Sequence, residues 1–396
     1  LEAFHALCEH EGEHATMLQI SALRRIRSEP AGIAVDDLEV FIPALVAYLF
    51  KDVRDGWLYR RNKDGVMLPW LVSYVRLFNP EQGSPYVIVG LMANTIWSAH
   101  NEVSDDPMSR HGGMTNAIVF YKHDLQGKTV PDLLAERGYF KETDELRRDY
   151  QAHEDRFLAM QPAFGEQFAC RNAMFLARGP QHTEFMKMPR GKVAKCVNDE
   201  GVLERSFDLN ADTSFWRELG IPVGFDRVPL HCYLYLFHLE LHRNVWVHVQ
   251  NLERYEYKPE LREKLVLPDS HRDLIDILTS DLEVLVDDIV EGKSGGTIIL
   301  CQGAPGLGKT LTAEVYSEVV GKPLYRVHSG QLGITAESVE ANLSTILQRA
   351  ARWDAIMLLD EADVYIRCRD NDLQHNAIVA EFLRTLEYFD GLLFMT

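Results

Sequence analysis

The sequence predicts an α/β fold for its last third and a mixed α+β fold for the residues before it. After residue 296, short apolar segments alternate with amphipathic helical segments, which is typical of a parallel sheet covered by helices on both faces. Before residue 258, strand-like and helical segments follow one another in groups instead. With 396 residues the chain is also too long for one ordinary core, so two domains are expected.

The first domain is expected to span residues 1–258. A helix is predicted near its start, because apolar residues recur at three- and four-residue spacing between Leu38 and Leu49. Strands are predicted next, where Gly, Pro and Asn clusters divide the chain, at residues 67–78, 86–93 and 116–121. A further amphipathic helix is predicted over residues 142–160.

A β-hairpin over residues 228–249 is the clearest strand signal of this domain. Apolar residues alternate with other residues on both sides of a polar stretch at residues 240–244. His231, His238, His242 and His248 fall around this hairpin. Some of them alternate with apolar residues and are therefore expected to face solvent or a partner, but an ordinary core or surface role is the favoured interpretation for these histidines.

The second domain is expected to begin at Lys258-Pro259 and to span residues 259–396. A helix start is predicted at Pro268-Asp269-Ser270, because apolar residues follow at helical spacing. Four buried strands are then predicted at residues 297–301, 323–328, 356–360 and 392–396. Helices are predicted between them, at residues 309–320, 335–351 and 374–389.

Charge and composition narrow the classes of function. The formal net charge of −18 argues against broad contact with nucleic acid or acidic membranes, because phosphate binding depends on Lys and Arg. The six cysteines form no C-x-x-C pair, which suits free thiols in a reducing compartment. No apolar run is long enough to span a bilayer. A cytoplasmic location is therefore expected.

A phosphate-binding loop is predicted between the first strand and the first helix of the α/β region. The run Gly303-Ala304-Pro305-Gly306-Leu307-Gly308-Lys309-Thr310 matches the P-loop pattern G-x-x-x-x-G-K-[ST]. Glycines let backbone N–H groups point at a phosphate, and the helix N-terminus adds partial positive charge. Lys309 is expected to reach the β- and γ-phosphates of ATP, and the Thr310 hydroxyl is expected to bind Mg²⁺.

The second half of the predicted site lies at the end of the apolar strand 356–360. Four apolar residues there precede Asp360 and Glu361, and the carboxyl ends of parallel strands are where ligands bind. Asp360 is expected to hold Mg²⁺, and Glu361 to orient and deprotonate the attacking water. Lys309 and Glu361 are the predicted catalytic residues. The predicted nucleotide contacts are Gly303, Ala304, Pro305, Gly306, Leu307, Gly308, Lys309, Thr310, Leu311 and Asp360.

Two other classes of P-loop protein are disfavoured. Transporter-type ATPases also carry Leu-Leu-Asp-Glu and a signature loop that Ser329-Gly330-Gln331 superficially matches. In those proteins, however, the two nucleotide motifs lie much further apart, and the signature begins a helix instead of following a strand. A small-molecule kinase is a further possibility, but the Asp-Glu pair favours water as the nucleophile.

The two motifs together resemble the AAA+ ATPase family, a branch of the P-loop NTPases, over about residues 266–396. The resemblance implies a ring of identical subunits, commonly a hexamer, that remodels a macromolecular partner, with protein favoured. It also implies that residues 287–291 help to hold adenine. Two departures accompany it. The run Gln331-Leu332-Gly333-Ile334 lacks the aromatic residue of many pore loops. The sensor residue, arginine finger, fifth strand and helical lid would fall at or beyond the end of the sequence, so a truncated ATPase domain is expected.

Two functions follow as hypotheses. The first is an AAA+ ATPase with Mg²⁺-dependent ATP binding and hydrolysis in residues 259–396 and a recognition or regulatory domain in residues 1–258. The second is a nucleotide-gated assembly scaffold in which hydrolysis is slow or incidental.

Overall fold

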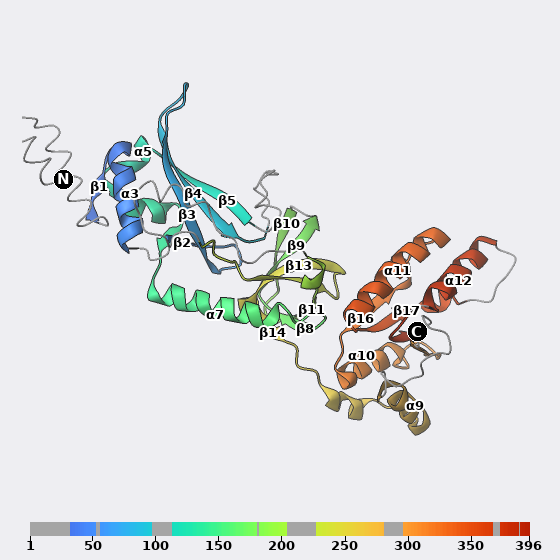
Figure 1. Ribbon diagram of the computed structural model, residues 1–396. Helices are drawn as coiled ribbons and strands as arrows, with labels where there is room; N and C mark the ends of the chain where they lie inside the picture. Colours follow the sequence, from blue (N-terminus) through green and yellow to red (C-terminus); the bar gives the residue numbers. More distant parts are fainter. Residues whose placement is uncertain are drawn as a thin grey trace, which may run out of the picture.

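The structure is a computed structural model that describes residues 32–52, 56–96, 113–179, 182–203, 227–280, 296–366, 373–387 and 389–396. Along these residues the chain forms two large antiparallel sheets and then one parallel sheet with its helices (Figure 1). The long helix α7 (Asp144–Met160) lies along the lower side of the N-terminal part in this view. Among the described residues, no helix has the length and apolar character needed to cross a membrane.

The first sheet has five strands in the order β5-β4-β3-β2-β7, and all neighbouring strands are antiparallel. Helix α3 (Leu38–Asp52) packs on this sheet through its apolar side, and Phe41 meets Phe120 edge to face with ring centres 5.0 Å apart. The strands are β2 (Trp57–Arg61), β3 (Met67–Phe78), β4 (Tyr86–Asn94), β5 (Gly113–Tyr121) and β7 (Tyr139–Lys141).

Short elements close this part of the chain beside α3. Strands β1 (Ala34–Val35) and β6 (Lys128–Thr129) pair with each other, and the helices α5 (Lys122–Leu125) and α6 (Val130–Glu136) flank β6. Thr129 caps α6 by accepting a hydrogen bond from the backbone N–H of Asp132. The predicted helix and the three predicted strands of this region are thereby confirmed.

The second sheet has seven strands in the order β10-β9-β13-β12-β11-β8-β14, also antiparallel throughout. It contains the predicted hairpin as β12 and β13. Helix α7 covers part of it through Phe157 and Met160. The strands are β8 (Gln167–Cys170), β9 (Ala173–Gly179), β10 (His182–Lys187), β11 (Ala194–Asn198), β12 (Tyr233–His238), β13 (Arg243–His248) and β14 (Leu252–Arg254).

The expectation that some histidines of this hairpin face solvent is wrong at three of the four positions, where the histidine is a core residue. His231, His238 and His248 are 1%, 3% and 2% exposed. Strand β12 lies in the middle of the sheet, and side chains pack against both faces of the sheet there. Residues that point to either face are therefore buried. Sequence alternation reports which residues share a face, but not whether the second face meets water.

The last sheet has four strands, and all neighbouring strands are parallel, as predicted. Their order is β15-β18-β17-β16. Helices α9 (Asp269–Ser280) and α10 (Lys309–Val320) share a core with one of its faces, and α11 (Ala336–Arg352) and α12 (Leu373–Leu386) with the other. The strands are β15 (Thr297–Leu300), β16 (Leu324–His328), β17 (Ile356–Asp360) and β18 (Leu392–Met395). This sheet with flanking helices confirms the predicted α/β fold of the region.

The predicted boundary at Lys258-Pro259 falls between β14 and the 3₁₀ turn at Pro259–Lys264. Packing nevertheless joins the two sides of this boundary. Phe237 of β12 is buried against Trp353 at the end of α11, with ring centres 4.9 Å apart, and Tyr325 of β16 lies 5.6 Å from Phe237. The seven-stranded sheet and the parallel sheet therefore share one hydrophobic core. A division into two domains at residue 258 stays a prediction.

Candidate functional site

The glycine-rich loop leaves the carboxyl end of β15 and leads into the first turn of α10. Gly306 and Gly308 both adopt a φ of 82°, a left-handed conformation that side chains disfavour. A Cβ built on either residue would meet no atom within 4 Å, so the backbone of this loop borders open space. The loop therefore has the conformation and the clearance that backbone phosphate binding requires.

Lys309, at the start of α10, folds back over this loop. Its Nζ donates hydrogen bonds to the carbonyl oxygens of Gly303 at 3.0 Å and Ala304 at 3.1 Å. Thr310 follows in the same turn of the helix and is half-buried. The apolar side chains beside the loop, Leu307 and Leu311, are 71% and 51% exposed. The predicted contact residues 303–311 thus form one continuous, largely exposed surface.

Asp360 ends β17, two strands away from β15 in the same parallel sheet. Strand β18 lies between them, and Thr396 follows it directly. The Thr396 hydroxyl donates to Asp360 Oδ1 over 2.5 Å, and the Arg326 Nη2 donates to Asp360 Oδ2 over 2.6 Å. Burial alone would raise the pKa of the Asp360 carboxyl, but these two hydrogen bonds and the charge of Arg326 hold it below its ordinary value. Asp360 is therefore ionised at neutral pH.

Glu361 is exposed and has a φ of 61°, which is unusual for a residue other than glycine. The Ser329 hydroxyl, from the end of β16, donates to its Oε2 over 3.5 Å. Because the strands are parallel, the ends of β15, β16, β17 and β18 lie at one edge of the sheet. The structure thus brings the glycine loop, Lys309, Asp360 and Glu361 to the same edge.

Two residues at this edge were not among the predicted site residues. Arg326 shares a strand face with His328, and the β16–β17 register sets His328 opposite Asp360. Thr396 reaches Asp360 from the neighbouring strand. The sequence signal for Arg326 was a charged residue inside the strand 324–328. The partner of Arg326 depends on the order of the strands, which cannot be inferred from the sequence.

Two further predicted segments are the pore-loop run at residues 331–334 and the adenine segment at residues 287–291. Leu332 of the predicted pore-loop run is buried, whereas Ile334 is 89% exposed. The Tyr365 hydroxyl lies within hydrogen-bond distance of the carbonyl oxygens of Ser329 and Gly333, at 2.8 and 3.0 Å, and its one hydrogen is shared between them. The predicted adenine segment, residues 287–291, lies outside the described part of the chain.

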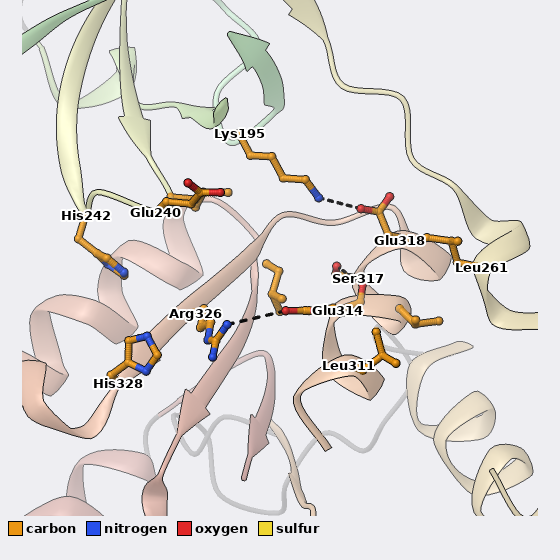
Figure 2. Close-up of a pocket in the computed structure, with 13 residues that line it drawn as sticks. Lys195, Glu240, His242, Leu261, Leu311, Glu314, Ser317, Glu318, Arg326 and His328 are labelled. Atoms are coloured by element: carbon orange, nitrogen blue, oxygen red, sulfur yellow. Dashed lines mark hydrogen bonds and ion pairs between the residues drawn. The ribbon is translucent and has the colours of Figure 1, made fainter. Parts of the chain in front are cut away.

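A cavity of about 540 Å³ lies next to this edge, between α10, β16 and the β12–β13 hairpin (Figure 2). Arg326 and Glu314 line it from the parallel-sheet side, and Glu240 and His242 line it from the hairpin (Figure 2). At its upper edge in the view, Lys195 Nζ is 2.9 Å from Glu318 Oε1. The cavity is therefore lined by charged as well as apolar side chains and is bounded by both sides of the predicted domain boundary.

Comparison with known proteins places one segment of this chain. Residues 299–395 match the model of the family described as "ATPase family associated with various cellular activities (AAA)". The uncharacterized AAA family ATPase y4kL of Sinorhizobium fredii is 29% identical over 140 residues, which is 32% of this chain and 41% of that protein. Lon protease homolog 3, mitochondrial, of Arabidopsis thaliana is 27% identical over 128 residues, 30% of this chain and 14% of that protein.

Among solved structures, the FIGL-1 AAA domain in complex with ADP aligns with a TM-score of 0.25 and 18% identity. The alignment covers 33% of this chain and 46% of that one. This chain spans less than half the length of the curated relatives named above. The family-model match and the relative from Sinorhizobium fredii show the resemblance to AAA ATPases for the parallel-sheet segment, which contains the candidate site.

Proposed function

We propose that this protein is an AAA+ ATPase in which residues 259–396 bind ATP with Mg²⁺ and hydrolyse it, while residues 1–258 form an appended recognition or regulatory domain. One observation carries the proposal. Within the segment that resembles AAA ATPases, the loop at the end of β15 and the acids at the end of β17 share one edge of a parallel sheet.

The loop would bind the phosphates of ATP. Its left-handed glycines and open surroundings suit close approach of backbone N–H groups to a β-phosphate. Lys309 would exchange its hydrogen bonds to the loop carbonyls for contacts to the β- and γ-phosphates. The N-terminus of α10 adds partial positive charge at the same point.

The acids would hold the metal and the water. The ionised Asp360 carboxylate and the Thr310 hydroxyl offer oxygen ligands of the kind that Mg²⁺ prefers, so the residues fit this ion. Bound there, Mg²⁺ supplies positive charge against the phosphates. Glu361, held near Ser329, would orient an attacking water and accept its proton.

We further propose that the protein acts as a homo-oligomeric ring, a hexamer by resemblance, which remodels a protein partner in the cytoplasm. The net charge of −18 favours protein over nucleic acid as that partner.

The test uses the full chain and separates binding from turnover. Wild type is expected to bind a fluorescent ATP analogue and to hydrolyse ATP. Lys309→Ala should weaken binding more than tenfold, because it removes charge-assisted hydrogen bonds. Glu361→Gln should keep binding but lose turnover by on the order of 100-fold, the usual contribution of a general base. Glu337→Gln, on the exposed start of α11, is the matched control and should match wild type. Undiminished hydrolysis in Glu361→Gln would refute the assigned base.

The second candidate is a scaffold whose assembly is switched by nucleotide while hydrolysis is slow. It is favoured by the run at residues 331–334, which has no aromatic residue and whose Leu332 is buried in the core. Light-scattering mass measurements with and without ATP, beside a turnover assay, distinguish the two functions. A nucleotide-dependent ring with negligible turnover would support the scaffold.

A further inference from the structure

We propose that Arg326 is a positioning residue of the nucleotide site, which holds Asp360 when no Mg²⁺ is bound and moves to Glu314 when Mg²⁺-nucleotide binds. This inference rests on the proposed nucleotide site and assigns a regulatory contact within it.

Arg326 occupies the carboxylate that the metal would need. Its Nη2 lies 2.6 Å from Asp360 Oδ2, while the other oxygen, Oδ1, accepts the Thr396 hydroxyl at 2.5 Å. The Asp360 side chain is only 15% exposed, so few other directions of approach remain. A divalent cation on this carboxylate would repel a guanidinium at hydrogen-bond distance, and Mg²⁺ and Arg326 therefore compete for Asp360.

The strand geometry explains why an arginine stands here. Residues 324, 326 and 328 of β16 point to the same face as Ile356, Leu358 and Asp360 of β17, and α10 covers that face. Tyr325 and Val327 point to the opposite face, where they are buried beneath α11. Arg326 is thus held between the acid at the strand end and helix α10.

Glu314 offers Arg326 a second carboxylate. It lies on α10 one turn beyond Thr310, and its Oε1 is 3.9 Å from Arg326 Nη1, beyond hydrogen-bond distance (Figure 2). The Arg326 Nε is buried and has no hydrogen-bond partner within the described residues, so the guanidinium is not held from every side. The cavity of about 540 Å³ beside it leaves room for the side chain to turn toward Glu314.

The movement would also reach the N-terminal region. Glu240 and His242, from the β12–β13 turn, line the same cavity as Arg326 (Figure 2). A guanidinium released from Asp360 would therefore stay between α10 and this turn. Binding of Mg²⁺-nucleotide would therefore change the position of a positive charge beside the β12–β13 turn of the appended region.

The test measures how much Mg²⁺ improves nucleotide affinity, and it needs no turnover. The Kd of a fluorescent ADP analogue is measured for the full chain in EDTA and in saturating Mg²⁺. Arg326→Gln should increase the gain from Mg²⁺ by about three- to fivefold, because the competitor for Asp360 is gone. Glu314→Gln should decrease the gain by a similar factor, because Arg326 loses its second partner. The double variant should behave like Arg326→Gln.

Arg384→Gln is the matched control, since Arg384 pairs with Glu340 and Glu381 away from this edge, and its gain should equal that of wild type. An unchanged or decreased gain in Arg326→Gln would overturn the proposal. Glu314→Gln keeps the Arg326–Asp360 pair and so tests the proposal even if Arg326→Gln folds poorly; no change in its gain would also count against it. Failure of wild type to bind nucleotide at all would instead refute the proposed function.

Discussion

Arg352 and Asp199 are 153 positions apart in the sequence, yet Arg352 Nη2 donates a hydrogen bond to Asp199 Oδ1 over 2.7 Å. The same carboxylate accepts the indole N–H of Trp353 at 2.8 Å and the Asn244 side-chain amide at 3.1 Å. Asp199 is 4% exposed and follows β11 directly. One buried carboxylate therefore ties the end of α11 to the seven-stranded sheet.

Replacing Asp199 by Asn should lower the free energy of unfolding by about 2 kcal/mol, because three donors lose a charged acceptor in a buried place. Urea denaturation followed by tryptophan fluorescence measures the loss. Asp354→Asn is the matched control: Asp354 pairs with Lys322, but its side chain is 77% exposed, so we expect a change of about 0.5 kcal/mol or less. Equal losses in the two variants would contradict this account of the interface.

Gly165 approaches the same end of α11 through its backbone. It has a φ of 76°, and a Cβ built on it would lie 2.9 Å from the Trp353 carbonyl oxygen. Gly165→Ala should therefore cost about 3 kcal/mol, the sum of left-handed strain and a clash with backbone that cannot easily move. Gly191 has a φ of 77° and open space around it, so Gly191→Ala should cost only about 1 kcal/mol. Thermal unfolding of both variants separates the clash with Trp353 from the left-handed strain that the two positions share. Equal losses of stability in the two variants would show that the clash is relieved without cost.

Much of the parallel-sheet region was predictable because its signals are local. The four strands and the helix at residues 309–320 follow from apolar runs and helical spacing, and the structure has them within a residue or two. The position of the glycine loop between strand and helix follows from the same patterns. That this loop and Asp360 lie at the same edge of the sheet was predictable as well, because parallel strands have their carboxyl ends at one edge.

The remaining features depend on strand order, which no local pattern encodes. The contact of Arg326 with Asp360 requires β16 to lie beside β17, and the Asp199–Arg352 bond joins residues 153 positions apart in the chain. The burial of His231 and His248 follows from covering both faces of the seven-stranded sheet. Alternation cannot reveal this, because it is the same for a strand with one face in water.

His231 should make the protein less stable in mild acid. Its Nε2 lies 2.7 Å from the Pro69 carbonyl oxygen, and burial lowers its pKa from about 6.5 to about 4. Between these values the unfolded chain binds a proton that the folded chain does not, so stability is complete above pH 6.5 and falls as the pH drops toward 4. The contribution lost between pH 7.5 and pH 5 is on the order of 2 kcal/mol.

Urea unfolding at pH 7.5 and pH 5 tests this on His231→Gln, whose amide can still donate to Pro69. The variant should lose about 2 kcal/mol less than wild type between the two pH values. His123→Gln is the control, because the His123 side chain is 75% exposed and its replacement should leave the pH dependence unchanged. A pH dependence in His231→Gln as steep as in wild type would assign the acid sensitivity to other groups, of which the buried His248 is the first to test.

Thr396 should be needed to aim Asp360 if the proposed ATPase function holds. Its backbone N–H donates to the Leu359 carbonyl at 3.0 Å, so its side chain is fixed beside Asp360, where the hydroxyl donates to Oδ1 at 2.5 Å. Thr396→Val keeps the shape but leaves this oxygen without its donor, and we expect ATP turnover to fall about tenfold. Thr396→Ser restores the hydroxyl and should recover most of the activity.

Thr385→Val, which removes a hydroxyl bonded to a helix carbonyl on α12, is the control for loss of a half-buried hydroxyl. Since phosphoryl transfer depends on positioning, turnover in Thr396→Val equal to that of Thr396→Ser would show that Asp360 is held well enough by its own strand.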